Sequence, residues 1–199
     1  MLKFLNTGKS FLKKCLPSTS YRHIRDLYKS YQKKQKANRK PFSKIEISKI
    51  LQTQLNIQEN DLIIVHSSVE NLNLDFSPIE LFSILKNLVG PEGTLVFPTH
   101  IDIRAEDFYK SDKVFDVRRT LSFTGILSEI ARRQKEAKRS LHPFNSVCAI
   151  GKEASFLTKD HHKSLLPCGP NTPYYRAIER KGKAIGLGVN TEFLSLVHC

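Results

Sequence analysis

The sequence has no tryptophan, one methionine and only four cysteines in 199 residues, and it has no long apolar run. A membrane-spanning helix needs about 20 predominantly apolar residues, so none is predicted. The first residues also lack the unbroken apolar core of a secretory signal, because Asn6, Lys9 and the pair Lys13–Lys14 interrupt it. These absences favour a cytoplasmic protein.

The cysteines do not predict a disulfide framework or a metal site. No two of them have the spacing of a zinc site, a CxxC motif or a disulfide-bonded secreted domain (Cys15, Cys148, Cys168 and Cys199). The sequence also lacks a GxxxxGK[ST] loop, and no GxGxxG follows a strand, which argues against a nucleoside triphosphate or NAD. We therefore expect ordinary apolar or surface cysteines in a reducing compartment, and no bound metal.

Positive charge is concentrated at the start of the chain. Residues 1–50 hold 14 Lys and Arg against two acids, a net charge of +12 out of the total of +13. The remaining 149 residues therefore have a net charge of +1. The globular part is nearly neutral, and the basic character belongs to an N-terminal segment.

This segment has a helical pattern. Ile24, Leu27 and Tyr31 predict one apolar side for a helix over residues 21–40, with cations on its other sides. We expect residues 1–42 to form a basic extension, helical or partly disordered. It is either solvated or in peripheral contact with an anionic membrane surface, which would place the protein at the inner face of the membrane. Nucleic acid is the least favoured partner.

From Ser43 onward, helical patterns alternate with short apolar runs. The strand-like runs are residues 61–68, 93–100, 145–151 and 183–189. The helical segments are residues 43–55, 77–90, 122–134, 172–182 and 190–198. This alternation predicts one α/β domain over residues 43–199, an α/β sandwich in which a largely parallel sheet is covered by helices on both faces.

Polar clusters follow three of the predicted strands, where ligands bind in such folds. They are VHSS at 65–68, PTHID at 98–102 and LGVNT at 187–191. On the last predicted helix, Thr191, Ser195 and His198 share one face. His198 has a pKa range suited to a general base toward a hydroxyl or an amine. Its alternative is an ordinary packed or surface histidine.

The stretch RSLHPFNSVCAIG at 139–151 holds several possible anion ligands. Arg139 offers a planar fork of donors, and Ser140, His142 and Ser146 offer further polar groups. With the hydroxyls of residues 67–68 they would form a phosphate cradle. The alternative is structural, with Arg139 paired to an acid and His142 capping a turn before a proline.

Taken in order, these clusters resemble the aminoglycoside 3-N-acetyltransferase family, and the resemblance covers residues 43–199. The matching segments are VHSS at 65, GPEGTLVFPTH at 90, FTGILSEIARR at 123, KRSLHPFNSVCAIGKEA at 138, the pair His161–His162, CGPNTPYYRAI at 168, IGLGV at 185 and SLVH at 195. The resemblance implies an α/β sandwich that transfers an acetyl group from acetyl-coenzyme A to an amine. The amine would belong to an aminoglycoside or another amino sugar.

The resemblance also implies roles for individual residues. The coenzyme-binding residues would be His66, Ser67 and Ser68, with Arg139, Ser140, His142 and Ser146 lining the same region. The catalytic residues would be His198, which matches the histidine of the family's TxxHxxE element, and Ser195, which replaces its threonine. No metal is implied.

Two departures from the family pattern accompany the resemblance. The glutamate of TxxHxxE would fall at position 201, beyond Cys199, and Glu192 is a poor substitute because it faces away from His198 on a helix. We therefore expect a family member that lacks the family's C-terminal part. The alternative function is a degenerate, inactive acetyltransferase fold that binds a membrane or a polyanion. The second departure is electrostatic: a free polycation needs an acidic pocket, whereas the core is nearly neutral and the extension strongly basic, a balance that fits an amino sugar on an anionic nucleotide or lipid carrier better.

Overall fold

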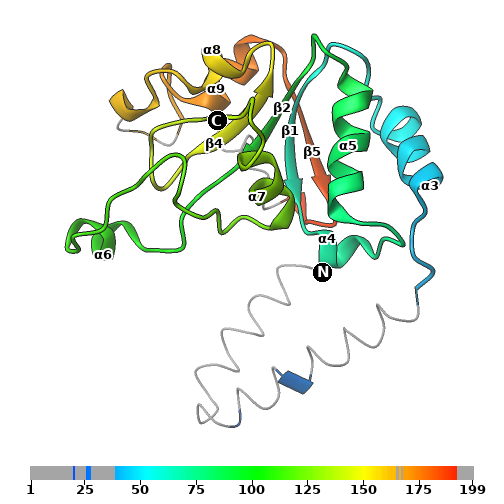
Figure 1. Cartoon of the computed structure of the whole chain (residues 1–199), viewed down its shortest axis with the longest axis horizontal. Helices are drawn as coiled ribbons and strands as arrows, with labels where there is room; N and C mark the ends of the chain where they lie inside the picture. Colours follow the sequence, from blue (N-terminus) through cyan, green and yellow to red (C-terminus); the bar gives the residue numbers. More distant parts are fainter. Residues whose placement is uncertain (1–19, 21–25, 28–38, 165, 167, 192–199) are drawn as a thin grey trace. The chain divides into compact units, whose positions relative to one another are not determined.

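The computed structural model describes residues 20, 26–27, 39–164, 166 and 168–191, and the chain divides into two units, Met1–Lys40 and Pro41–Cys199. Most of the basic helix predicted for residues 21–40 lies outside the described residues, and so does nearly all of the predicted final helix. Within the described part, no helix is both long enough and apolar enough to cross a membrane. The second unit contains the sheet (Figure 1).

The sheet has five strands in the order β3-β4-β2-β1-β5. In chain order they are β1 (Leu62–Ser67), β2 (Thr94–Pro98), β3 (Lys138–Arg139), β4 (Val147–Gly151) and β5 (Lys183–Leu187). β1 runs parallel to β2 and β5, whereas β4 runs antiparallel to β2 and β3 antiparallel to β4. The α/β class is confirmed, but the prediction of a largely parallel sheet holds only for β2-β1-β5.

The sequence pattern does not reveal two features that cause this difference: β4 runs antiparallel to β2, and β3 forms a hairpin with β4. β3 and β4 are joined by residues 140–146, and a short connection of this kind makes the two strands antiparallel. A buried apolar strand looks the same in sequence whichever way its neighbour runs. β3 has only two residues, too few to show any period.

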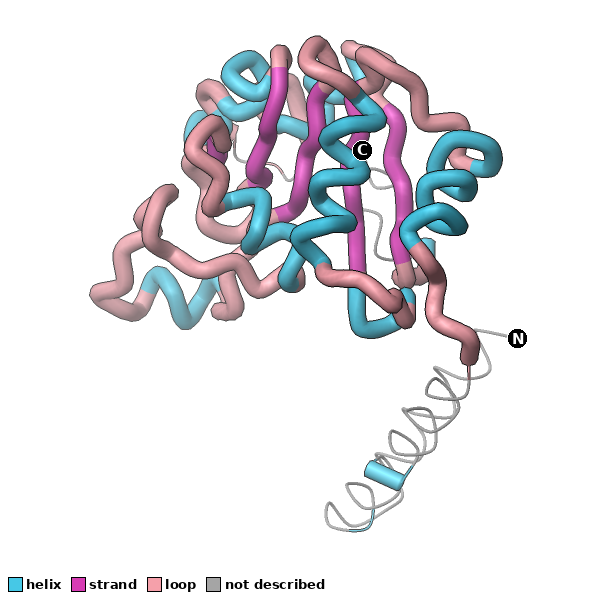
Figure 2. Tube along the Cα trace, turned by 45° about the vertical axis from the view of Figure 1, so that its right-hand side comes forward, coloured by secondary structure: helices cyan, strands magenta, loops and turns pink. Residues whose placement is uncertain are grey.

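Helices cover both faces of the sheet. The helices and helical turns are α3 (Lys44–Lys49), η1 (Ile50–Gln54), α4 (Val69–Leu72), α5 (Pro78–Val89), α6 (Ala105–Tyr109), α7 (Ile126–Arg132), α8 (Ala154–Thr158), η2 (His161–Lys163) and α9 (Pro173–Glu179). Because neighbouring strand residues face opposite sides, Ile63 and Val65 pack into the core with α3, α5 and α7, and Leu62 and Ile64 pack with α8 and α9. Figure 2 shows the helices on either side of the strands. The sandwich is therefore confirmed.

Local signals fix where the main helices begin. Ser43 and Ser77 each form a capping box, in which the serine hydroxyl accepts from the backbone N–H of Glu46 or Glu80 at 3.3 Å. In return, each glutamate accepts from the serine backbone N–H at 2.8 Å. α7 begins only at Ile126, later than the pattern at 122–134 predicts.

Parallel pairing aligns the strand ends that carry the polar clusters. The register pairs His66 with Gly186 and Ser67 with Leu187, so β1 and β5 end side by side. β2 lies on the other side of β1 and ends at Pro98. The clusters at 65–68, 98–102 and 187–191 therefore lie near one another, at the lower edge of the sheet in Figure 1.

Candidate functional site

A cavity of about 730 Å³ opens at the carboxyl ends of β1 and β2. One wall is formed by residues 66–70, which end β1 and begin α4, and the opposite wall by residues 123–126 and Ser128, which lead into and begin α7. Pro98, His100 and Val189 complete the lining. This is the position in which α/β sheets bind their ligands.

Three polar atoms at this cavity are buried without an internal hydrogen-bond partner. They are His66 Nε2, Ser67 Oγ and His100 Nε2, and no described residue bonds to them. The His66 side chain is only 6% exposed. A buried polar atom without a partner costs about 1–3 kcal/mol, so folded proteins seldom keep one without a purpose. Three of the five such atoms in the described part of the chain belong to residues that line this cavity, which favours it as a binding site.

The two imidazoles are neutral at physiological pH. Burial, with a smaller contribution from the neighbouring His100, lowers the pKa of His66 to about 4. Burial likewise lowers the pKa of His100 to about 4, with smaller contributions from His142 and Arg139. Glu70, which is exposed, is the one acidic side chain among the lining residues, and no lysine or arginine lies among them. The cavity therefore suits a ligand portion with polar but uncharged groups.

A second cavity, of about 580 Å³, adjoins the first. It shares His100, Phe123 and Thr124 with the first cavity. Its other lining residues lie in the segment 101–107, with Asp102, Arg104 and Asp107 as its charged members, and at Phe144. The two cavities thus differ in charge and meet at three common residues.

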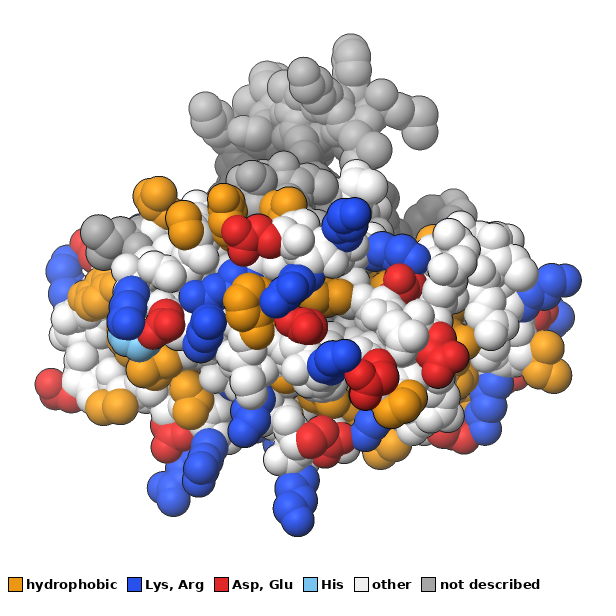
Figure 3. Space-filling model, turned by 90° about the horizontal axis from the view of Figure 1, so that it is seen from above, with side chains coloured by type: hydrophobic (Ala, Val, Ile, Leu, Met, Phe, Trp, Pro, Cys, Tyr) orange, Lys and Arg blue, Asp and Glu red, His pale blue; other side chains and the backbone are white. Residues whose placement is uncertain are grey.

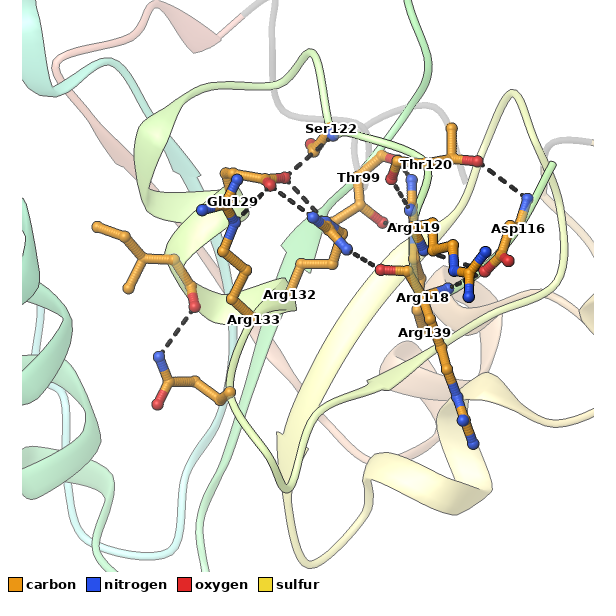
Figure 4. A network of polar contacts seen from close by, with 12 residues as sticks. Thr99, Asp116, Arg118, Arg119, Thr120, Ser122, Glu129, Arg132, Arg133 and Arg139 are labelled. Carbon is orange, nitrogen blue, oxygen red and sulfur yellow. Dashed lines mark hydrogen bonds and ion pairs between the residues drawn. The ribbon is translucent and has the colours of Figure 1, made fainter.

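Arg139 braces the loop that follows β2 (Figure 4). Its Nε donates to Thr99 Oγ1 at 3.1 Å, and its two terminal nitrogens donate to the carbonyl oxygens of Thr99 and Thr120. The guanidinium also lies 4.6 Å from the ring centre of Phe115. Each nitrogen therefore has a protein acceptor, and within the described part of the chain no carboxylate pairs with this arginine.

The serines of the same stretch are also engaged inside the protein. Ser146 Oγ donates to the carbonyl oxygen of Thr99 at 2.7 Å and accepts from Thr99 Oγ1 at 3.2 Å. Ser140 Oγ accepts from the backbone N–H of Val147 at 3.0 Å and lies 2.8 Å from His161 Nδ1. Both serine residues are fully buried. Neither lines the 730 Å³ cavity.

His142 caps a turn, as its structural alternative predicts. Its Nδ1 accepts from the backbone N–H of Asn145 at 3.1 Å, and its ring stacks on that of His161 at 4.7 Å between centres. Like Arg139, it does not line the 730 Å³ cavity. The structure brings His66 and the serines of residues 67–68 together at the cavity, and it places the residues of the 139–146 stretch behind the loop at Thr99.

A second brace holds the wall formed by residues 122–126. Glu129 accepts from the backbone N–H of Ser122 at 3.1 Å and from Arg132 Nε at 2.8 Å, and the Glu129 and Arg132 side chains are 14% and 7% exposed. The hydrogen bond from Arg132 is the main cause that lowers the pKa of Glu129 to about 2. This pair was not predicted from the sequence. Its spacing of three residues on a predicted helix was the available signal.

The remaining predicted residues divide into two groups. His198 and Ser195, the predicted catalytic pair, lie outside the described residues. Cys148 is a free, buried thiol, and burial raises its pKa to about 12, which argues against a role as a nucleophile. Cys168 is disulfide-bonded, and the spacing of the cysteines does not predict this bond. Within the described ranges, no group of three or more His, Cys, Asp or Glu side chains is placed to hold a metal ion.

The sequence is similar to a known family and to several of its members. Residues 64–199 match the family model for aminoglycoside 3-N-acetyltransferase, which is more than half of the chain. Aminoglycoside N(3)-acetyltransferase IV of Salmonella sp is 30% identical over 145 residues, covering 72% of this chain and 53% of the relative. Aminoglycoside N(3)-acetyltransferase VII of Streptomyces paromomycinus is 30% identical over 161 residues, covering 73% and 56%. The chain thus spans about half the length of these curated relatives.

Solved structures agree with the sequence relatives. The structure of AAC-IIIb in a binary complex with CoASH superposes with a TM-score of 0.70 at 26% identity, covering 80% of this chain and 64% of that chain. AAC-VIa bound to sisomicin superposes with a TM-score of 0.69 at 25% identity and the same coverage. The family model, the relatives and the shared sandwich lead to one conclusion: the chain belongs to the aminoglycoside 3-N-acetyltransferase family.

Proposed function

We propose that this chain binds acetyl-coenzyme A in the 730 Å³ cavity and transfers its acetyl group to an amino group of an aminoglycoside or another amino sugar. The observation that carries the proposal is the set of buried polar atoms without partners at the cavity, His66 Nε2 and Ser67 Oγ above all. Membership of the family and the likeness to a structure that holds CoASH support the same assignment. The site needs no metal for this chemistry.

The cavity fits the acyl end of the coenzyme in size and polarity. Ligand pockets range over roughly 300–1,000 Å³, and a narrow amide-containing arm needs hydrogen-bonding groups without charge. Ser67 and Ser68 supply hydroxyls, and the neutral His66 supplies one donor and one acceptor. These three residues would contact the coenzyme directly.

The stretch at 139–146 would act on the site indirectly. Arg139 and Ser146 both bind Thr99, which lies next to His100 at the cavity. Their hydrogen-bonding groups are already engaged with the protein, so we propose that they fix the loop rather than contact the coenzyme. Ser140 and His142 would hold the hairpin that carries this brace.

The chemistry would be a direct transfer. The acceptor amine attacks the thioester carbonyl carbon, the C–S bond breaks, and the amine proton passes to a base and finally to the coenzyme A sulfur. By family correspondence the base would be His198, with Ser195 beside it. No covalent intermediate on Cys148 is required, because the high pKa of that buried thiol makes it a poor nucleophile.

The acceptor would be a cationic amino sugar bound on the side of the second cavity. Asp102 and Asp107 outnumber Arg104 among the charged residues that line that cavity, and opposite charge attracts ammonium groups. Elsewhere, charges of both signs alternate over the surface, as Figure 3 shows for the face at the amino ends of β1 and β5. The solved relative AAC-VIa bound to sisomicin supports this class of acceptor.

The proposal is tested by turnover. The chain is mixed with acetyl-coenzyme A and either sisomicin or a nucleotide-linked amino sugar, and the release of coenzyme A thiol is followed with a chromogenic disulfide. We expect coenzyme A to be released in the presence of one of the two acceptors. Which acceptor supports the release shows whether the substrate is a free polycation or an amino sugar on an anionic carrier. A folded chain that binds acetyl-coenzyme A but acetylates neither acceptor would contradict the transfer to amino sugars.

A further inference from the structure

His100 occupies the junction of the two cavities. It follows β2 by two residues, and it lines both the 730 Å³ cavity and the 580 Å³ cavity. Phe123 and Thr124, the other two shared residues, lie beside the end of β2 and lead into α7: the Phe123 N–H donates to the His100 carbonyl oxygen, and Thr124 Oγ1 donates to the Pro98 carbonyl oxygen. A ligand that extends from one cavity into the other would have to pass this imidazole.

The backbone on both sides of His100 is held by hydrogen bonds. Thr99 donates its N–H to the carbonyl oxygen of Ser146 at 2.8 Å, and its side chain and carbonyl are bound by Arg139 and Ser146. The carbonyl oxygen of His100 accepts from the N–H of Phe123 at 2.9 Å. Such support is what a functional side chain needs in order to keep a productive geometry.

The side chain of His100 itself has no comparable engagement. Its Nε2 is buried and has no hydrogen-bond partner among the described residues, although the backbone N–H groups of Thr99 and Ile101 on either side are hydrogen-bonded. Burial keeps the imidazole neutral, with a pKa of about 4. A neutral imidazole carries one N–H donor, and it can polarise a carbonyl without introducing a charge into the site.

We propose that His100 is a catalytic residue that contacts both substrates where the two cavities meet, and that it donates a hydrogen bond to the thioester carbonyl oxygen during the attack. The inference deepens the proposed function and rests on it. As the N–C bond forms, negative charge develops on that oxygen, and His100 stabilises it without gaining or losing a proton. When the C–S bond breaks, the charge leaves with the sulfur, which receives the proton lost by the amine.

A binding experiment tests this placement without depending on turnover. The sequence has seven histidines, so their imidazole carbon–proton signals can be followed by two-dimensional NMR, and His100→Gln assigns one of them. Coenzyme A and sisomicin are added separately to the whole chain. We expect the His100 signal to move with each ligand, and the signal of the exposed His162, assigned by His162→Gln, to move with neither.

Kinetics supply the second readout. Removing one donor to a developing oxyanion lowers kcat about 100- to 1,000-fold. We expect such a loss in His100→Ala, partial recovery in His100→Gln, and coenzyme A affinity within about threefold of the wild type in both.

Three results would overturn the inference. The first would be that the NMR signal of His100 moves with only one ligand, or with neither, although calorimetry shows that both ligands bind. The second would be a kcat of His100→Ala within threefold of the wild-type value. The third would be a complete loss of coenzyme A binding in His100→Ala. If the wild-type chain itself binds no coenzyme A, the proposed function fails, and the inference fails with it.

Discussion

Replacing Arg139 by alanine distinguishes a brace from a direct ligand contact. The guanidinium donates to Thr99 Oγ1 and to the carbonyl oxygens of Thr99 and Thr120, and it lies over the ring of Phe115. Hydrogen bonds from a charged donor contribute about 1.5–3 kcal/mol each, but they are not additive. Thr99 O keeps its bond from Ser146, and water can reach part of the space that the side chain leaves.

We therefore expect Arg139→Ala to lower the free energy of unfolding by about 2–4 kcal/mol. Arg139→Lys should recover only part of this, because one ammonium cannot span both Thr99 and Thr120. Arg133→Ala is the matched control. Arg133, like Arg132, pairs with Glu129, but the Arg133 side chain is 65% exposed. Its removal should therefore lower the free energy of unfolding by less than about 1 kcal/mol.

The assay is urea unfolding followed by circular dichroism, with coenzyme A titrated into each folded variant. As a brace, Arg139 affects stability first, and coenzyme A binding weakens only as the wall at His100 loosens. The reasoning would be refuted if Arg139→Ala were as stable as Arg133→Ala and yet had lost coenzyme A binding. That result would instead support a direct contact between Arg139 and a phosphate group of the coenzyme, as the sequence suggests.

Three further predictions concern stability. The pKa values of His66 and His100 (about 4) and of His161 (about 3) lie below the ordinary 6.5, so the unfolded chain binds protons more readily than the folded chain. The stability that these histidines contribute is therefore fully present above about pH 6.5 and falls toward pH 4, with uptake of about two to three protons on unfolding at pH 5. A flat profile of unfolding free energy against pH over this window would contradict the prediction. Glu129→Gln should lower the melting temperature because it leaves the buried Arg132 unpaired, whereas Glu92→Gln at an exposed pair should not; equal melting curves would exclude the second brace. Gly188→Ala would place a Cβ 2.6 Å from the carbonyl oxygen of Ser68, at a backbone φ of 69°. We expect this substitution to lower the free energy of unfolding, measured in urea, by about 1–3 kcal/mol. Gly169→Ala is the control and should be tolerated, because its Cβ would meet no atom closer than 3.8 Å.

The sequence predicted the elements of the fold better than their directions. The runs that became β1, β2, β4 and β5 were recognisable because each is apolar, short and bounded by polar or turn residues. The start of α7 was predicted too early, since Gly125 has a φ of 108° and ends the preceding loop rather than joining the helix. The antiparallel half of the sheet consists of the β2–β4 pair and the β3–β4 hairpin, and hydrophobic periodicity shows the strand direction in neither.

The site was predicted in part. The strand-end position placed His66 and the hydroxyls of residues 67–68 near the other polar clusters, because parallel strands end at one edge, and the structure places these residues at a cavity. Their contact with the coenzyme stays a prediction. The same reasoning did not separate residues that line the cavity from those that support it. Arg139 and Ser146 have the chemistry of anion ligands, but the structure engages them with Thr99, and only tertiary contacts reveal this.

Two expectations stay predictions. The boundary of the basic extension at residue 42, and its peripheral contact with a membrane, concern residues that lie almost wholly outside the described part of the chain. No observation favours the inactive, membrane- or polyanion-binding alternative, and the relatives compared above carry the names of acetyltransferases. A vesicle-binding assay with anionic lipid, in which salt releases the chain, would test the membrane contact.

The central claim is that the cavity at the end of β1 binds the coenzyme. Calorimetric titration of coenzyme A tests it most directly, with the wild-type chain, Ser67→Val and Ser83→Ala. Ser67 Oγ lies buried at the cavity without a partner among the described residues, whereas Ser83 is exposed on α5. We expect micromolar binding by the wild type and Ser83→Ala, and a loss of about tenfold or more in Ser67→Val, since one hydrogen bond is worth about 1.4 kcal/mol there. A folded wild-type chain that binds no coenzyme A, or equal affinity in Ser67→Val, would contradict the account.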